Sequence, residues 1–199
     1  GREKQNHDVY AAVVDLPIGN KDLHQCADAI IRLRAEYLWK TKQFKKIHFN
    51  LTNGFQVDYE RWRKGDRVKV TGNRSEWVHS ATASDSYKVF WQYLEFVFSY
   101  AGTLSLSREL PSVPFAGIQI GDVLIQGGSP GHAVIVVDMA TDASGRKIFL
   151  LAQSYMPAQE IQVLLNPANK DGSPWYRTVS DGDFETPQWT FTTNDLKRF

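Results

Sequence analysis

Apolar residues recur at helical spacing in two long stretches of the chain. Between Asp22 and Lys42 they fall at steps of three and four residues, which predicts an amphipathic helix. A second helix is predicted from Ser86 to Ser107, and its many aromatic side chains indicate that it is buried. Short polar residues stand before both stretches as expected N-caps, Asn20 or Asp22 before the first and Ser84 or Asp85 before the second.

Other apolar runs have the length and residue types of strands. Four of them lie in the second half of the chain, at Asp122 to Gln126, His132 to Met139, Lys147 to Ser154 and Ile161 to Leu165. The turn Asp142 to Gly145 is expected to join the second and third as a hairpin. In the first half we expect a strand at Val9 to Leu16, a small hairpin of Ile47 to Leu51 with Phe55 to Val57, and one helical turn at Tyr59 to Lys64.

These elements predict an α+β fold. Residues 9–199 are interpreted as one domain, in which an antiparallel sheet packs against the two helices and the loop-rich tail from residue 166 wraps the sheet. A chain of 199 residues with 42% apolar and 13% aromatic residues can bury a core without a metal or a disulfide. Residues 1–8 are polar and are expected to be a disordered start or an expression remnant. This start is compatible with a signal sequence that was removed beforehand.

Composition excludes several classes of function. The 23 basic and 22 acidic residues leave a formal charge of +1, and no basic run marks a nucleic-acid footprint, so nucleic acid is not an expected partner. No apolar run is long enough for a transmembrane helix. The single cysteine, Cys26, excludes an intrachain disulfide and a multi-cysteine zinc site, and no histidine spacing suggests another metal site.

Cys26 and His132 are the residues with the clearest chemistry. A thiol nucleophile needs a base to take its proton and a third polar group to orient that base. Cys26 stands near the start of the first helix, where the helix dipole favours a thiolate with a lowered pKa. His132 begins a very apolar strand after the glycine-rich segment Gly127 to Gly131, which we interpret as a mobile lip to a cleft.

The third group is predicted from hairpin register. If the turn is centred near Ala143 and Ser144, His132 lies across from the segment Gln153 to Tyr155. Gln153 or Ser154 can therefore orient the imidazole, because a side-chain oxygen fixes the tautomer by accepting a ring N–H.

The order of these residues resembles the papain-like amidases of the NlpC and CHAP types. The resemblance rests on a cysteine opening a helix, Gly121-Asp122 leading into a strand, Gly131-His132 at the start of an apolar strand, and a polar residue on the next strand. Members of those families cut peptide or amide bonds in bacterial cell walls. This sequence departs from them at the nucleophile, where Gln25 to Asp28 replaces the usual Asp-Cys-Ser-Gly, and in the longer separation of Cys26 from His132.

The resemblance implies a papain-like fold and a cofactor-free cysteine hydrolase outside the cytoplasm, whether periplasmic, surface-anchored or secreted. Cys26 would be the nucleophile, His132 the general base and acid, and Gln153 the orienting residue. A peptide, amide or cell-wall-like substrate would be contacted by Gly131, Ser154, Tyr155 and Trp175. The whole chain, with AQSYMPAQEIQVL from Ala152 and SPWY from Ser173, also resembles an uncharacterised family of bacterial secreted proteins.

Each candidate residue also has a purely structural interpretation. Most free cysteines are small buried hydrophobic residues, and a histidine at a strand end is often a satisfied loop residue. On that interpretation the chain is a non-catalytic peptide- or glycan-binding module on the same scaffold. The loops Met156 to Gln159 and Ser173 to Tyr176 would then line its groove.

Overall fold

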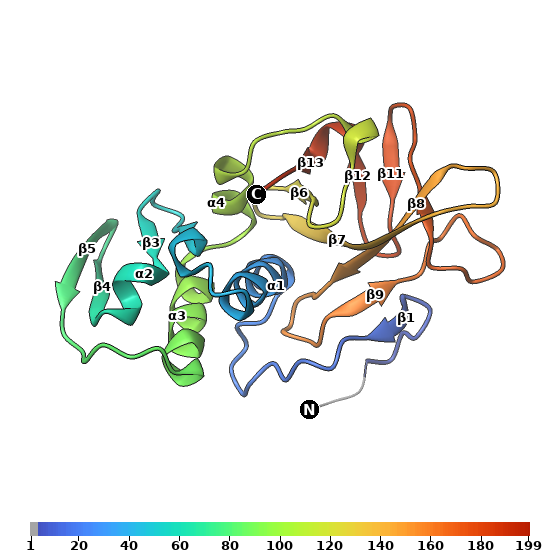
Figure 1. The fold of residues 1–199 in the computed structure, drawn as a ribbon. Coiled ribbons are helices and arrows are strands. Elements are labelled where there is room, and N and C mark those ends of the chain that lie inside the picture. The colour runs from blue at the N-terminus through green and yellow to red at the C-terminus, as the bar shows by residue number, and fades with distance from the viewer. Residues whose placement is uncertain (1–3) are drawn as a thin grey trace.

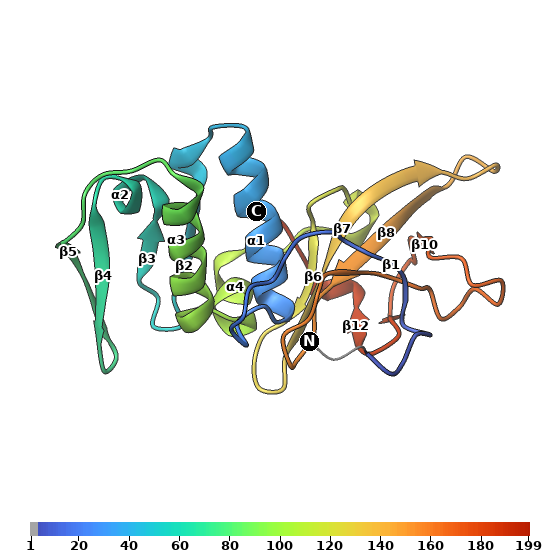
Figure 2. The ribbon, with the colours of Figure 1, turned by 90° about the horizontal axis from the view of Figure 1, so that it is seen from below.

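Helix α1 stands between an antiparallel sheet and a smaller lobe of helices and hairpins in the computed structural model, which describes residues 4–199 (Figures 1 and 2). Within these residues the sheet has seven strands in the order β1-β9-β8-β7-β6-β13, with β10 paired to β8, and every pair is antiparallel. Their bounds are β1 Tyr10–Val13, β6 Val123–Gln126, β7 His132–Thr141, β8 Lys147–Gln153, β9 Gln162–Leu164, β10 Tyr176–Arg177 and β13 Leu196–Lys197.

The central hairpin of β7 and β8 has the predicted turn and register. Gly145 takes a positive φ of 80° in the turn, a conformation that glycine adopts without strain. Ile135 lies opposite Ala152 on the neighbouring strand. This register brings the first residue of β7 beside the last residue of β8, at one end of the sheet.

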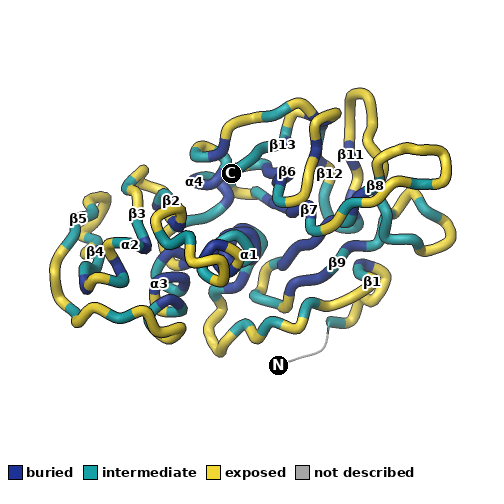
Figure 3. Tube along the Cα trace, in the orientation of Figure 1, coloured by how far each residue is buried: buried dark blue, intermediate teal, exposed yellow. Residues whose placement is uncertain are grey.

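The middle strands are buried on both faces because each face has its own cover. On β7, Ala133 and Ile135 belong to a core shared with α1 and the smaller lobe. Val134 and Val136 point to the other face, where they pack in a second core with aromatic residues of the tail. The tail therefore wraps the sheet as predicted, and contributes a further pair of strands, β11 Asp183–Glu185 and β12 Thr190–Thr192. Figure 3 shows buried residues in α1, in α3 and along the middle strands.

Helix α1, Cys26–Lys40, begins four residues later than expected, and neither Asn20 nor Asp22 caps it. Its N-cap is Gln25, whose backbone N–H donates to the Asp28 carboxylate at 2.9 Å. A carboxylate three residues into the helix satisfies this N–H, so the helix starts where Asp28 can reach. The consequence is that Cys26 is the first residue of the helix.

The second predicted helix is two helices. α3 spans Tyr87–Tyr100 and α4 spans Thr103–Glu109, and Ser86, rather than Ser84 or Asp85, caps α3. The break falls at Gly102, which has an extended backbone with φ −176°, and its N–H donates to the Ser105 hydroxyl at 3.0 Å. A serine side chain that bonds a nearby backbone group competes with a continuous helix, which explains the interruption.

Two hairpins and a short helix complete the smaller lobe. The predicted hairpin is present as β2 His48–Asn50 with β3 Gln56–Asp58, followed by the predicted helical turn, α2 Tyr59–Arg63. Residues 66–79 form a hairpin that the sequence pattern did not predict, β4 Asp66–Thr71 with β5 Arg74–His79. Short 3-10 turns lie at Phe44–Lys46, Phe115–Gly117 and Thr193–Asp195. Among residues 4–199, no helix is long and apolar enough to cross a membrane.

Candidate functional site

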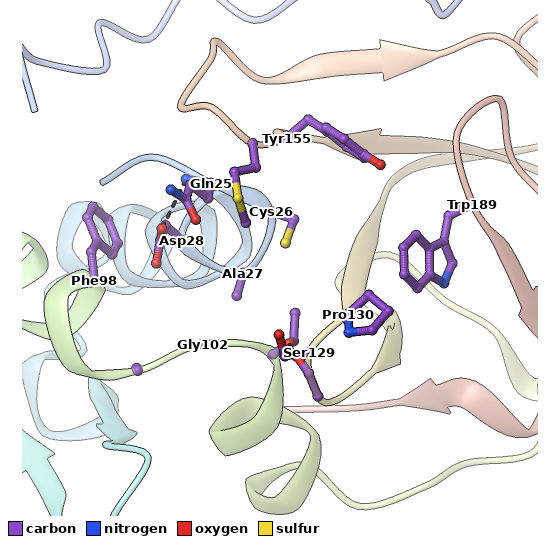
Figure 4. Close-up of a pocket in the computed structure, with 15 residues that line it drawn as sticks. Gln25, Cys26, Ala27, Asp28, Phe98, Gly102, Ser129, Pro130, Tyr155 and Trp189 are labelled. Atoms are coloured by element: carbon purple, nitrogen blue, oxygen red, sulfur yellow. Dashed lines mark hydrogen bonds between the residues drawn. The ribbon is translucent and has the colours of Figure 1, made fainter. Parts of the chain in front are cut away.

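A pocket of about 460 Å³ opens where β7 begins and β8 ends. Its walls are the first turn of α1, the junction of α3 and α4, the segment Gly128 to Gly131, and the loop after β8. Trp189 closes it from the tail side. Figure 4 shows the Cys26 thiol at the end of α1, facing the space bounded by Pro130 and Trp189. The pocket is thus the place where the thiol at the start of α1 meets the end of the sheet.

Cys26 is only partly buried and holds a neutral thiol. Burial raises its pKa above the usual value, and the nearby Asp28 carboxylate raises it further. Backbone N–H groups of Ala27, of Ala133 on β7 and of Cys26 itself act in the opposite direction, because they stabilise negative charge on sulfur, but they do not outweigh burial. The expectation of a lowered thiol pKa at the helix start is therefore wrong.

Asp28 is the one acidic side chain among the pocket-lining residues. It is buried, and desolvation raises its pKa to about 7 although its bond with the Gln25 N–H works in the other direction. The charge beside Cys26 therefore changes near neutral pH.

His132 is held by an amide and enclosed by aromatic rings. Its Nε2 lies 2.7 Å from Gln153 Oε1, and the imidazole is 2% exposed. The ring centroids of Tyr155, Trp189 and Phe191 lie 5.0, 5.4 and 6.0 Å away. Burial lowers the pKa of His132, and the bond with Gln153 only partly opposes this, so the imidazole is neutral at pH 7.

The two ring nitrogens of His132 have different surroundings. Because Gln153 presents an oxygen, Nε2 must carry the proton and Nδ1 is the basic nitrogen. Within the described residues Nδ1 makes no hydrogen bond. An unoccupied basic nitrogen on a rigid strand is the feature that a general base requires.

Cys26 and His132 are neighbours without a direct bond. In residues 4–199 no hydrogen bond joins the thiol to the imidazole. Their link is Ala133, which follows His132 on β7 and whose backbone N–H contacts the sulfur. The resting arrangement is a neutral thiol beside a neutral imidazole.

Two of the four predicted substrate contacts line the pocket and two do not. Gly131 and Tyr155 are in its wall. Ser154 is completely buried, with its hydroxyl 2.7 Å from the carbonyl oxygens of His24 and Gln159, so it ties the loop after β8 to the chain before α1.

Trp175 lies elsewhere in the fold. It precedes β10, which pairs with Ile148 and Phe149 toward the end of β8 remote from Gln153. The aromatic residue that the tail supplies to the pocket is Trp189.

The glycine-rich segment before β7 packs against α4 at Gly131. A Cβ atom on Gly131 would lie 2.5 Å from Thr103 Oγ1 and 2.6 Å from the Gly128 carbonyl oxygen. Thr103 also donates to that carbonyl, at 3.4 Å. Glycine is needed here because the segment lies directly against α4.

Sequence reasoning missed the residues that the remote segments bring to the site. Gln188 accepts a hydrogen bond from Gln153 Nε2 at 2.8 Å, and Lys4 donates to Gln188 at 3.1 Å. Residues 1–3 of the predicted disordered start lie outside the described residues. The only available signal for Asp28 was its position three residues after a cap, and nothing local marks Gln188 or Lys4.

Comparison with known proteins assigns the chain to a family. Residues 1–198 match the model of the family described as Domain of unknown function (4846), and the chain belongs to this family. No curated protein and no solved structure matches the chain. Within residues 4–199, no group of three or more histidine, cysteine, aspartate or glutamate side chains is arranged to hold a metal ion.

Proposed function

We propose that this protein is a papain-like cysteine hydrolase that cleaves a peptide or amide bond in cell-wall-like material outside the cytoplasm. One observation carries the proposal. His132 is fixed by Gln153 with its basic Nδ1 unoccupied, and it directly follows Gly131, which lines the same pocket as Cys26 at the start of α1. The order of the three residues, which resembles that of NlpC-type and CHAP-type amidases, supports the same proposal.

The proposed reaction starts from the neutral pair. The Cys26 sulfur attacks the carbonyl carbon of a bound amide while His132 Nδ1 takes the thiol proton, so that an S–C bond forms and the carbonyl oxygen gains the negative charge. Backbone N–H groups in the first turn of α1 are suitable donors for this oxyanion. The imidazolium then protonates the leaving nitrogen as the C–N bond breaks.

The second half of the reaction regenerates the enzyme. Water attacks the acyl carbon while His132 Nδ1 accepts one of its protons, and the S–C bond then breaks as the imidazolium returns this proton to sulfur, which releases a carboxylic acid and restores the thiol and the neutral imidazole. The thiol must turn from the Ala133 N–H toward Nδ1 before the first step. Catalytic hydrogen bonds are often long or absent without substrate and form in the substrate complex, which is compatible with the resting structure.

The lining of the pocket favours an uncharged or amine-bearing substrate. Aromatic walls from Phe98, Tyr155 and Trp189 offer stacking surfaces for a peptide or sugar, while Asp28 is the only charged group in the lining.

A cleavage assay with purified peptidoglycan and with a mixture of unstructured peptides tests the proposal. Wild-type protein should release new amino and carboxyl termini, detected by mass spectrometry, and Cys26→Ala should release none. Equal release by both proteins, or none by the wild type from either substrate, would refute it. Cys26→Ser is the matched variant that keeps the pocket shape.

A binding module is the second candidate, and the raised thiol pKa together with the missing thiol–imidazole bond favours it. It requires the pocket to bind a muropeptide or glycan with an affinity that Cys26→Ala leaves unchanged. Calorimetry with soluble muropeptides measures this, and binding without products would select this function.

A further inference from the structure

A chain of hydrogen bonds leads from Lys4 to His132. Lys4 Nζ lies 3.1 Å from Gln188 Oε1 and 3.1 Å from Gln162 Oε1. Gln153 Nε2 donates to the same Gln188 oxygen at 2.8 Å, and Gln153 Oε1 faces His132 Nε2 at 2.7 Å. This series of hydrogen bonds joins the segment before β1, the tail and the end of β8.

Lys4 determines which group donates and which accepts along this series of hydrogen bonds. An ammonium group only donates hydrogen bonds, so the Gln188 atom that faces it must be the amide oxygen. Gln153 must then present its NH₂ to that oxygen and its own oxygen to His132. An oxygen accepts only, so His132 Nε2 carries the ring proton and Nδ1 is left as the base.

Without the lysine, the opposite direction is equally well bonded. If both amides turned over, Gln188 would donate to Gln153, and Gln153 would donate to an unprotonated Nε2, placing the ring proton on Nδ1. In that arrangement the Gln188 NH₂ would face the ammonium group of Lys4, donor against donor. The positive charge of Lys4 therefore favours one of these two amide arrangements over the other.

We infer that Lys4 and Gln188 are positioning residues that select the Nε2–H tautomer of His132 and so keep Nδ1 basic. The inference rests on the proposed function for its consequence, since only a base needs Nδ1 unprotonated. The wall of Tyr155, Trp189 and Phe191 around the imidazole supports it by limiting the water that could satisfy either tautomer. Lys4 also lies over the Tyr155 ring, 5.9 Å from its centroid.

The test reads the tautomer directly. Histidine-selective ¹⁵N labelling and long-range ¹H–¹⁵N correlation spectra at neutral pH distinguish Nε2–H from Nδ1–H, and the spectrum of His132→Ala assigns the resonances. The variants are Lys4→Met and Gln188→Leu, which remove the donor and the acceptor. Lys4→Arg keeps a cationic donor, and Gln188→Glu keeps an acceptor-only group facing both partners.

The expected result is a single Nε2–H tautomer in the wild type, Lys4→Arg and Gln188→Glu. Lys4→Met and Gln188→Leu should show a second set of ring resonances from the Nδ1–H form. Lys21→Met, which removes an ion pair of 2.9 Å with Glu95, should match the wild type. A single Nε2–H tautomer in both Lys4→Met and Gln188→Leu, or an altered tautomer in Lys21→Met, overturns the inference.

Activity separates this inference from the proposed function. If the tautomer responds as expected while no substrate is cleaved, the positioning role stands and the hydrolase proposal fails. If cleavage depends on Cys26 but the tautomer ignores Lys4 and Gln188, the positioning role fails. Where both hold, cleavage by Gln188→Leu should fall about tenfold, the factor that corresponds to one hydrogen bond to a charged group, and Gln188→Glu should restore it.

Discussion

The carboxyl group of Asp28 raises the pKa of the Cys26 thiol from two residues further along α1. A like charge disfavours the thiolate, so the same residue whose carboxylate accepts the hydrogen bond at the helix start also keeps the thiol protonated.

Asp28→Asn should therefore make Cys26 more reactive. At pH 8 the Asp28 carboxyl is ionised, because burial raises its pKa only to about 7, and removing its charge should speed alkylation by iodoacetamide about threefold or more. Below pH 6 the carboxyl is protonated in the wild type, so the two rates should converge. Asp15→Asn, which removes an exposed charge, is the control. A constant ratio of the rates across this pH range would contradict the prediction.

Wild-type Cys26 should react more slowly than a free cysteine at pH 7. Burial raises its pKa, so a smaller fraction is thiolate, and the alkylation rate should still be rising with pH where a model thiol has reached its plateau. The measurement is the rate of iodoacetamide labelling followed by mass spectrometry from pH 6 to pH 10, with a cysteine-containing peptide alongside. A plateau at lower pH than that of the peptide would show an activated thiolate instead.

His132→Ala should destabilise the fold. The imidazole is almost fully buried, and its loss leaves Gln153 Oε1 without a donor and opens space among three aromatic rings. The free energy of unfolding should fall by about 2–4 kcal/mol. His79→Ala, at an exposed position, should change it by less than about 0.5 kcal/mol. Urea titrations measure the free energy of unfolding of both variants. Equal values for His132→Ala and His79→Ala would show that the His132 imidazole does not contribute to packing.

His24 should make the fold sensitive to acid. Burial lowers its pKa from 6.5 to about 4, so between these values the unfolded chain binds a proton that the folded protein does not. The contribution of neutral His24 to the free energy of unfolding is fully present above pH 6.5. About 3 kcal/mol of it is lost as the pH falls toward 4. Compared with His24→Gln, the wild type should therefore lose more free energy of unfolding between pH 7.5 and pH 4.5. His48→Gln, at an exposed position, serves as control, and parallel losses in wild type and His24→Gln would be inconsistent with this linkage.

Gly131→Ala should lower stability by about 1–3 kcal/mol, because its Cβ would overlap Thr103 and the Gly128 carbonyl. The matched control is Gly117→Ala, where a Cβ atom meets nothing within 4 Å. Melting temperatures of the two variants measure the difference. If Gly131→Ala and Gly117→Ala have the same melting temperature, the segment before β7 is packed less tightly than its contacts indicate.

The parts of the site that local sequence determines were predictable. The turn at Asp142 to Gly145 fixes the pairing of β7 with β8, and this pairing places Gln153 beside His132. The start of α1 was misplaced because Asn20 and Asp22 are better N-caps by residue type than Gln25. The position of Asp28, three residues after Gln25, was the overlooked signal.

Contacts between remote segments could not be predicted. Trp175 and Trp189 both lie in a loop-rich tail, and only the path of the chain over the sheet decides which one reaches the pocket. Lys4 and Gln188 come from segments without a periodic pattern, so no spacing rule relates them to Gln153. The break at Gly102 was missed because the apolar periodicity continues across it.

The cover of the second face of the sheet has a consequence for the newly made chain. Residues 176–192 supply Gln188, Trp189 and Phe191 to His132, and they are synthesised after every other part of the site. A partly synthesised chain already holds Cys26, His132 and Gln153 but lacks Gln188, the hydrogen-bond partner of Gln153, and two of the three aromatic rings around the imidazole. The pocket around Cys26 is therefore complete only when the tail has folded over the sheet, so the segment that is made last determines when the site is assembled.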